Sequence, residues 1–215
     1  MPEPISGNIS LDLVKKCDAN LSALEYKKCN LFSKSAFGWW KVKTMMHALS
    51  AMNAPVDLAC IRCPQEAPHR AGYSPKHNVV WVCSNHVWNP FEFRRLVAHE
   101  LVHAFDFARA KVDPKNLKHI ACSEVRAWNL SGECELWTKS WDYFGGQYVG
   151  ERKRCVRSSS VESVKQSGLK PSDQEAEAVV DEIFEKCRKD YWPFTHAPEL
   201  DNRWIQPPYL TDKRK

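Results

Sequence analysis

The sequence predicts an α+β protein that is mostly helical and has one small antiparallel sheet. Apolar residues recur at helical spacing over long stretches on both sides of the segment 55–89. Within that segment, two short runs of β-branched and aromatic residues are bounded by Pro, Gly and Asn, which is typical of strands. With 215 residues, 43% of them hydrophobic, the chain is large enough for one packed domain, with or without a terminal extension.

Two helices are expected before the sheet. The first covers residues 10–29 with Ser10 as its N-cap, and the second covers residues 36–52. Tryptophans and lysines cluster around the start of the second helix, which leaves two interpretations open: a segment at a membrane interface, or a core helix with exposed lysines. The residues concerned are Lys34, Trp39, Trp40, Lys41 and Lys43.

The expected strands cover residues 57–61 and 78–83. They precede the helix that carries the strongest chemical motif of the chain. An exposed edge of such a sheet can pair with an extended peptide backbone and hold it beside that helix.

That helix is predicted to run from Pro90 to about Arg109 or Lys111, because Asn89 supplies an N-cap and Pro90 a first-turn proline. In its middle stands the run His99-Glu-Leu-Val-His103. Positions four apart share one face of a helix, so both imidazoles can point at one cation. Two histidines with a neighbouring glutamate are typical of zinc hydrolases. The alternative is a pair of ordinary core or surface histidines.

In a zinc hydrolase of this kind the metal acidifies a water molecule, and Glu100 accepts the proton. A third protein ligand is needed. Glu124 is the best candidate, because it lies 21 residues beyond His103 on a helix that can fold back across the first. His119 remains open, and Glu124 as a surface partner of Arg126 is the alternative. The remaining candidates are Asp106, which is turned about 60° away from His103 on the helix, and Asp113. No oxyanion stabiliser is identified; the candidates are Tyr143, Tyr148 and His119.

Further helices are expected after this motif. One covers residues 117–131 and stops at Gly132, and another passes through Trp137 and Trp141 to Phe144. Residues 151–165 and 172–187 complete the set, the last with Ser172 and Glu175 as a capping box. Prolines 193, 198, 207 and 208 then exclude a regular element, so an irregular tail is expected.

Nine cysteines are spread over the chain, a high number for a reducing compartment. They leave three interpretations open: disulfides with at least one thiol left over, free thiols, or a second zinc site. That second site would join Cys60 and Cys63 to Cys83 and one of His69, His77 or His86. The first ten residues resemble neither a signal peptide nor a presequence, which alone would predict a cytosolic protein. The cysteines instead indicate the mitochondrial intermembrane space.

The net charge of +5 is too small and too scattered to predict nucleic-acid binding, although it fits weak attraction to an anionic membrane surface. The chain contains no apolar run of about 18 residues, so no membrane-spanning segment is expected.

Three blocks of sequence resemble the mitochondrial inner-membrane metalloproteases of ATP synthase assembly, a family also catalogued as Ku-binding proteins. The blocks are His99-Glu-Leu-Val-His-Ala-Phe-Asp106, Leu117-Lys-His-Ile-Ala-Cys-Ser-Glu-Val-Arg126 and Asn129-Leu-Ser-Gly-Glu-Cys134. The resemblance covers about residues 40–195. Ala54-Pro55 departs from an expected Gly-Cys pair, and Trp128 replaces a small residue.

The resemblance implies a zincin-like zinc endopeptidase domain over residues 36–195, after a weakly matching helical segment (1–35) and before the tail (196–215). It implies His99 and His103 as Zn²⁺ ligands and Glu100 as the catalytic residue. The family processes the precursor of a membrane subunit of ATP synthase and assists assembly of the membrane sector, bound peripherally to the inner membrane in the intermembrane space. The alternatives are a zinc-stabilised assembly chaperone without essential proteolysis and a nuclear DNA-repair adaptor.

Overall fold

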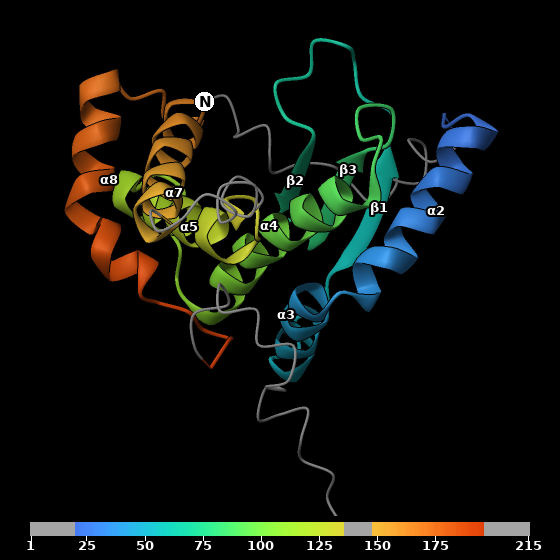
Figure 1. Cartoon of the computed structure of the whole chain (residues 1–215), viewed down its shortest axis with the longest axis horizontal. Coiled ribbons are helices and arrows are strands. Elements are labelled where there is room, and N and C mark those ends of the chain that lie inside the picture. Colours follow the sequence, from blue (N-terminus) through green and yellow to red (C-terminus); the bar gives the residue numbers. More distant parts are fainter. Residues whose placement is uncertain (1–19, 136–147, 196–215) are drawn as a thin grey trace, which may run out of the picture. The chain divides into compact units, whose positions relative to one another are not determined.

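The computed structural model describes residues 20–135 and 148–195, which fold into helices and one three-stranded sheet (Figure 1). The expected α+β class is confirmed, and helices predominate. The chain divides into two compact units, Met1–Val112 and Asp113–Lys215. The expected boundaries at residues 35 and 195 stay predictions.

The first unit begins with α2 (Ala23–Gly38) and α3 (Trp40–Ala51). Ser22 and Glu25 form a capping box that starts α2. The expected helix over 10–29 is therefore confirmed from residue 23, but it is wrong at residues 20–22 and in its end, because α2 continues to Gly38. Residues 10–19 lie outside the described part of the chain. Extended backbone at Trp39 (φ −79°, ψ 131°) separates the two helices. Lys41 is buried with its ammonium group near the rings of Trp39 and Trp40, whereas Lys34 and Lys43 are exposed.

The sheet has the strand order β1-β3-β2, with β1 (Asp57–Ile61), β2 (Ala71–Ser74) and β3 (Val79–Cys83). β1 is parallel to β3, and β2 is antiparallel to it. The expectation of an antiparallel sheet is therefore wrong for one of its two pairings. The cause is the short strand β2, which lies between the two expected strands in the sequence and turns back into β3.

Glycine is required at position 72 in β2 because the indole ring of Trp81 lies very close to the backbone there. A Cβ atom at this position would lie 2.4 Å from the indole of Trp81, so only glycine lets the ring lie against the strand. The central strand β3 is buried along its whole length, which explains its unbroken apolar run.

Helix α4 (Pro90–Arg109) packs against β2, β3, α2 and α3 and so forms the centre of the first unit. Two disulfides cross-link this unit. Cys29–Cys60 joins α2 to β1, and Cys63–Cys83 joins the segment after β1 to the end of β3. Because Cys60 and Cys63 are bonded to different partners, the interpretation of this pair as half of a second zinc site is wrong.

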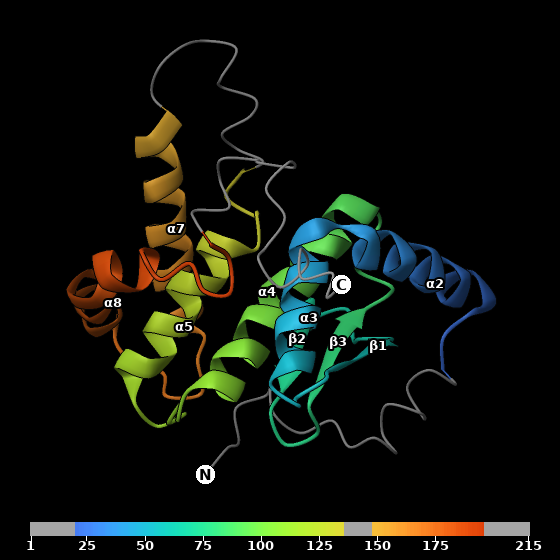
Figure 2. The same ribbon diagram turned by 90° about the horizontal axis from the view of Figure 1, so that it is seen from below.

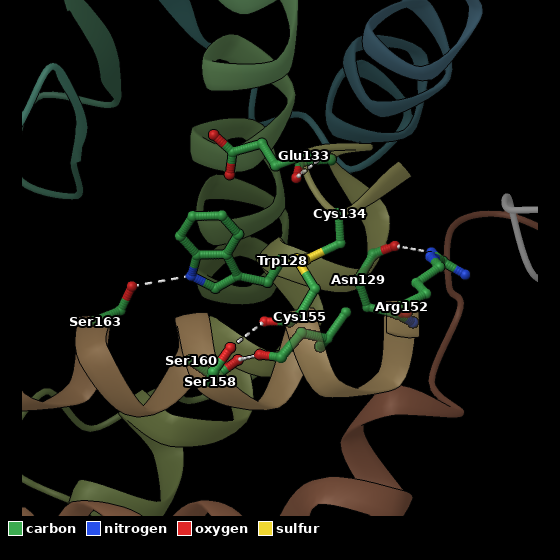
Figure 3. Close-up of a disulfide and its surroundings, with 11 residues drawn as sticks. Trp128, Asn129, Glu133, Cys134, Arg152, Cys155, Ser158, Ser160 and Ser163 are labelled. Carbon is green, nitrogen blue, oxygen red and sulfur yellow. Dashed lines mark hydrogen bonds between the residues drawn. A yellow bond between two sulfur atoms is a disulfide. The ribbon is translucent and has the colours of Figure 1, made fainter. Parts of the chain in front are cut away.

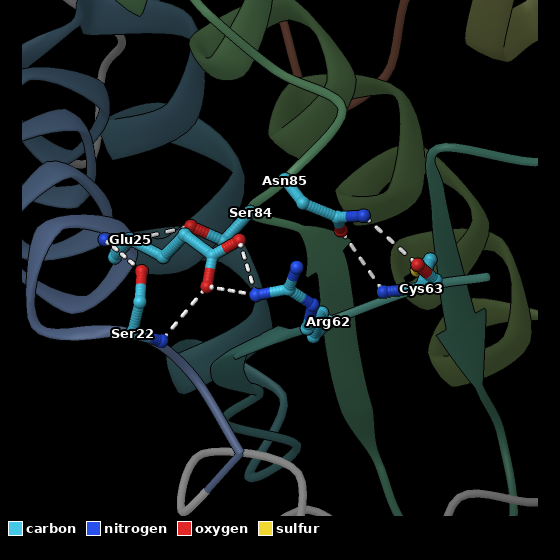
Figure 4. A network of polar contacts seen from close by, with 6 residues as sticks. All are labelled: Ser22, Glu25, Arg62, Cys63, Ser84 and Asn85. Carbon is cyan, nitrogen blue, oxygen red and sulfur yellow. Dashed lines mark hydrogen bonds and ion pairs between the residues drawn. The ribbon is translucent and has the colours of Figure 1, made fainter. Parts of the chain in front are cut away.

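A polar network fixes the start of α2 beside the sheet (Figure 4). The carboxylate of Glu25 accepts hydrogen bonds from the backbone N–H of Ser22 at 2.8 Å and from the guanidinium of Arg62 at 2.9 and 3.1 Å. The hydroxyl of Ser84 donates to the backbone oxygen of Glu25 at 3.0 Å. These contacts, above all the Ser22 N–H, hold the pKa of the Glu25 carboxyl below its usual value.

The described helices of the second unit are α5 (Leu117–Leu130), α7 (Tyr148–Lys165) and α8 (Asp173–Arg188), each of which contacts the other two (Figure 2). All three were expected from the sequence, including the capping box at the start of α8 and the stop of α5 before Gly132, whose φ is 87°. The expected helix near residues 137–144 and the tail after 195 lie outside the described residues.

Two further disulfides cross-link the second unit, Cys122–Cys187 between α5 and α8, and Cys134–Cys155 between the segment after α5 and α7. Figure 3 shows the polar contacts around Cys134–Cys155. The indole N–H of Trp128 donates to the hydroxyl of Ser163 at 2.9 Å, so the bulky side chain is held within this unit.

Candidate active site

The candidate site is built on α4, whose limits agree with the sequence analysis. The side chain of Asn89 accepts a hydrogen bond from the backbone N–H of Glu92 at 2.7 Å, and Pro90 occupies the first turn. The helix ends where the backbone of Ala110 becomes extended. Because α4 packs on a sheet and two helices, most residues of its middle turns are buried.

His99 and His103 lie one turn apart in these middle turns. Their ring centroids are 5.0 Å apart with an angle of 68° between the planes. His99 is 8% exposed and His103 is half-buried. The expectation that the two imidazoles share one face of the helix is therefore met by the geometry.

Glu100 follows His99 in the chain and is also only 8% exposed. A carboxylate in such surroundings is poorly hydrated, and its charge is costly without a compensating partner. The combination of two imidazole nitrogens and a neighbouring buried carboxylate suits a divalent transition metal. It is a poor match for Mg²⁺ or Ca²⁺, which prefer oxygen ligands alone.

The family profile of the Peptidase M76 family matches residues 25–195. This chain belongs to the Peptidase M76 family. Membership makes it a metallopeptidase, in agreement with the histidine pair of α4. No solved structure gave a significant match to the chain.

Several curated relatives of this M76 peptidase carry the name mitochondrial inner membrane protease ATP23. The relative from Schizosaccharomyces pombe is 37% identical over 150 residues, which cover 68% of this chain and 80% of the relative. The relative from Meyerozyma guilliermondii is 33% identical over 184 residues, or 85% and 72% of the two chains. The human homolog is 36% identical over 156 residues, or 72% and 61%.

The other acidic candidates of the M76 peptidase have local partners. Asp106 is buried, and its carboxylate accepts a hydrogen bond from Arg109 at 3.0 Å. The carboxylate of Asp113 accepts from the backbone N–H of Lys115 at 2.9 Å. Both contacts stabilise the chain locally, at the end of α4 and just before α5.

His119 and Glu124 lie on α5, in the second compact unit. His119 is exposed, and its Nδ1 atom accepts a hydrogen bond from the backbone N–H of Asp113 at 3.1 Å. Glu124 is half-buried. Tyr143 and the side chain of Tyr148 lie outside the part of the chain that the structure describes.

One residue on the histidine face was not singled out by the sequence analysis. Arg95 is half-buried and stands four residues before His99 on α4, so it extends the same stripe by one turn. The signal was present in the sequence as an i, i+4 spacing.

Among the described residues, none of the helices is both long enough and apolar enough to cross a membrane.

Proposed function

We propose that this chain is a zinc-dependent endopeptidase in which His99, His103 and Glu124 hold the metal and Glu100 is the catalytic residue. The observation that carries the proposal is the pair of imidazole rings 5.0 Å apart, next to a buried glutamate, in a chain of a metallopeptidase family. The two nitrogen donors favour Zn²⁺ among the divalent metals of proteolytic enzymes.

The third ligand is assigned from the sequence and from local contacts. A histidine pair needs one more protein ligand to bind zinc and leave a position open. Glu124 follows His103 by 21 residues and stands on the next helix. His119 is the weaker candidate, because its Nδ1 atom already accepts a backbone hydrogen bond.

When bound, the metal supplies Lewis-acid chemistry, which polarises the scissile carbonyl and acidifies water. Glu100 accepts the proton of the attacking water at a carboxylate oxygen as the new C–O bond forms. It then delivers that proton to the amide nitrogen as the C–N bond breaks. The low exposure of Glu100 limits competition from bulk water for this proton.

We infer a location at the mitochondrial inner membrane, with peripheral attachment on the side of the intermembrane space. The names of the relatives support a location at the mitochondrial inner membrane. Four disulfides within the described residues support an oxidising compartment. The substrate we propose, from the family resemblance, is the precursor of a membrane subunit of ATP synthase, together with help in assembly of the membrane sector.

The test is the variant Glu100→Gln, compared with Glu92→Gln in the first turn of the same helix. We expect Glu100→Gln to retain bound zinc, measured by mass spectrometry of the metal, and to lose peptide hydrolysis by about 10²–10⁴-fold. Glu92→Gln should cleave normally. Full hydrolysis by Glu100→Gln would overturn the assignment. Restoration of ATP synthase assembly in cells by Glu100→Gln would show that the assembly role does not need proteolysis.

A further inference from the structure

Four large apolar side chains are exposed together on the first unit, on α2 and at the start of α4. Leu24 is 72% exposed, Leu31 65%, Trp88 71% and Phe91 56%. Leu24 and Leu31 are seven residues apart and therefore share one face of α2. An exposed apolar cluster of this kind marks an interaction surface more often than a single exposed leucine does.

Cation–π contacts link α2 and the residue that follows it to the start of α4 and the residues just before it in two places. The ammonium group of Lys28 on α2 lies 3.9 Å from the centre of the Trp88 ring. The guanidinium of Arg94 on α4 lies 4.8 Å from the ring of Phe91 and 4.6 Å from that of Trp39, at the end of α2. We call this cluster the α2–α4 surface; it comprises Leu24, Lys27, Lys28, Leu31, Lys34, Trp88, Phe91 and Arg94.

The exposed charged side chains that α2 contributes to the α2–α4 surface are all positive. Lys27 and Lys34 are exposed, and both lie on the solvent side of that helix. The sole acidic residue of α2 is Glu25, which is buried and paired with Arg62. An approaching partner therefore meets apolar groups flanked by positive charges.

We propose that the α2–α4 surface docks on an anionic lipid bilayer. Leucine, phenylalanine and tryptophan enter the boundary between headgroups and acyl chains, while the exposed Lys27 and Lys34 reach the lipid phosphates. Charge complementarity selects this occupant, because lysines gain free energy near a negatively charged leaflet. The inference rests on the proposed location at the inner membrane and names the residues that hold the enzyme there.

The test is flotation of the full, oxidised chain with vesicles of phosphatidylcholine or of phosphatidylcholine mixed with phosphatidylglycerol. We expect binding to the mixed vesicles, weakened by salt. The double variant Lys27→Gln/Lys34→Gln should bind them about 25-fold more weakly, about fivefold for each lysine. Its matched control is Lys43→Gln/Lys76→Gln, which removes two exposed lysines outside the α2–α4 surface. The variant Leu24→Ser/Leu31→Ser should lose at least about tenfold in affinity.

Equal binding to both kinds of vesicle, or equal weakening by the control variant, would overturn the inference. So would variants that float normally but fail to bind the substrate protein, because the surface would then be a protein-docking site. Hydrolysis of a soluble peptide, measured on the same preparations, should be unchanged. Failure of the unsubstituted chain to float with the mixed vesicles would therefore count against lipid docking, whereas retained hydrolysis by Glu100→Gln would count against the proposed enzyme.

Discussion

The guanidinium of Arg126 lies 2.7 Å from the carboxylate of Asp190, although the arginine side chain is only 1% exposed. The same guanidinium donates to the backbone oxygens of Asp190 and Trp192. Nearby, the side-chain amide of Asn129 donates to the backbone oxygen of Arg188 at 2.8 Å. Helix α5 thus binds the end of α8 and the segment that follows it through buried polar contacts.

Replacement of Arg126 by methionine should therefore destabilise the protein. The side chain retains its volume, but two backbone oxygens and a carboxylate lose their donor. We expect a loss of about 3 kcal/mol in the free energy of unfolding, measured with urea. Arg154→Met, at an exposed position of α7, is the control and should change stability by less than about 0.5 kcal/mol. Equal stability of the two variants would show that the Arg126 contacts contribute little.

The two disulfides of the second unit should differ in how much they contribute to the free energy of unfolding. Cys122–Cys187 closes a sequence separation of 65 residues, and Cys134–Cys155 closes one of 21. Loop-closure entropy predicts losses of about 4 and about 3 kcal/mol for replacement of each pair by serine. Denaturant unfolding of the two double variants, both otherwise oxidised, gives the comparison. A larger loss for the shorter loop would contradict the entropic explanation.

The ionised carboxylate of Glu25 should make the free energy of unfolding depend on pH. Its pKa in the folded chain is lowered, first by the backbone N–H of Ser22 and then by Arg62, so its stabilisation is complete above about pH 4.5. This stabilisation is lost as the pH falls through the lowered pKa of Glu25. Glu25→Gln should cost about 2 kcal/mol at neutral pH and much less in strong acid. Unfolding measured over this pH range tests the prediction, with the exposed Glu66→Gln as control.

Removal of the metal should abolish hydrolysis and also lower the unfolding temperature, because a ligand that binds only the folded chain stabilises it. We expect a chelator to have both effects and added Zn²⁺ to reverse them. His103→Ala should bind no zinc and should not respond to the chelator in a thermal unfolding assay. Replacement of the exposed His47 by alanine is the matched control. Normal zinc binding by His103→Ala would remove this residue from the ligand set.

The helices with strong end signals were predictable from the sequence. Asn89 and Pro90 begin α4, and Ser172 with Glu175 begins α8, and both helices start where expected. The start of α2 was missed although Ser22 and Glu25 form the same kind of capping box, because apolar spacing upstream suggested an earlier start. Periodicity indicates that a helix exists, whereas the cap fixes where it begins.

The direction of the strands was not predictable in the same way. β2 has only four residues, and one of them is Gly72, which disfavours a strand on propensity alone. Its place depends on the Trp81 ring across the sheet, a contact between residues that sequence patterns do not reveal. At the site, the spacing of His99 and His103 implied their proximity because one helix carries both. A ligand from another helix has no such local signature, so Glu124 stays a prediction.

The four described disulfides are shared equally, two within Met1–Val112 and two within Asp113–Lys215, and none of these four joins one unit to the other. Each half of the enzyme can consequently complete its oxidation without waiting for the other. A nascent chain released early would hold a locked first half ahead of an unfinished second half.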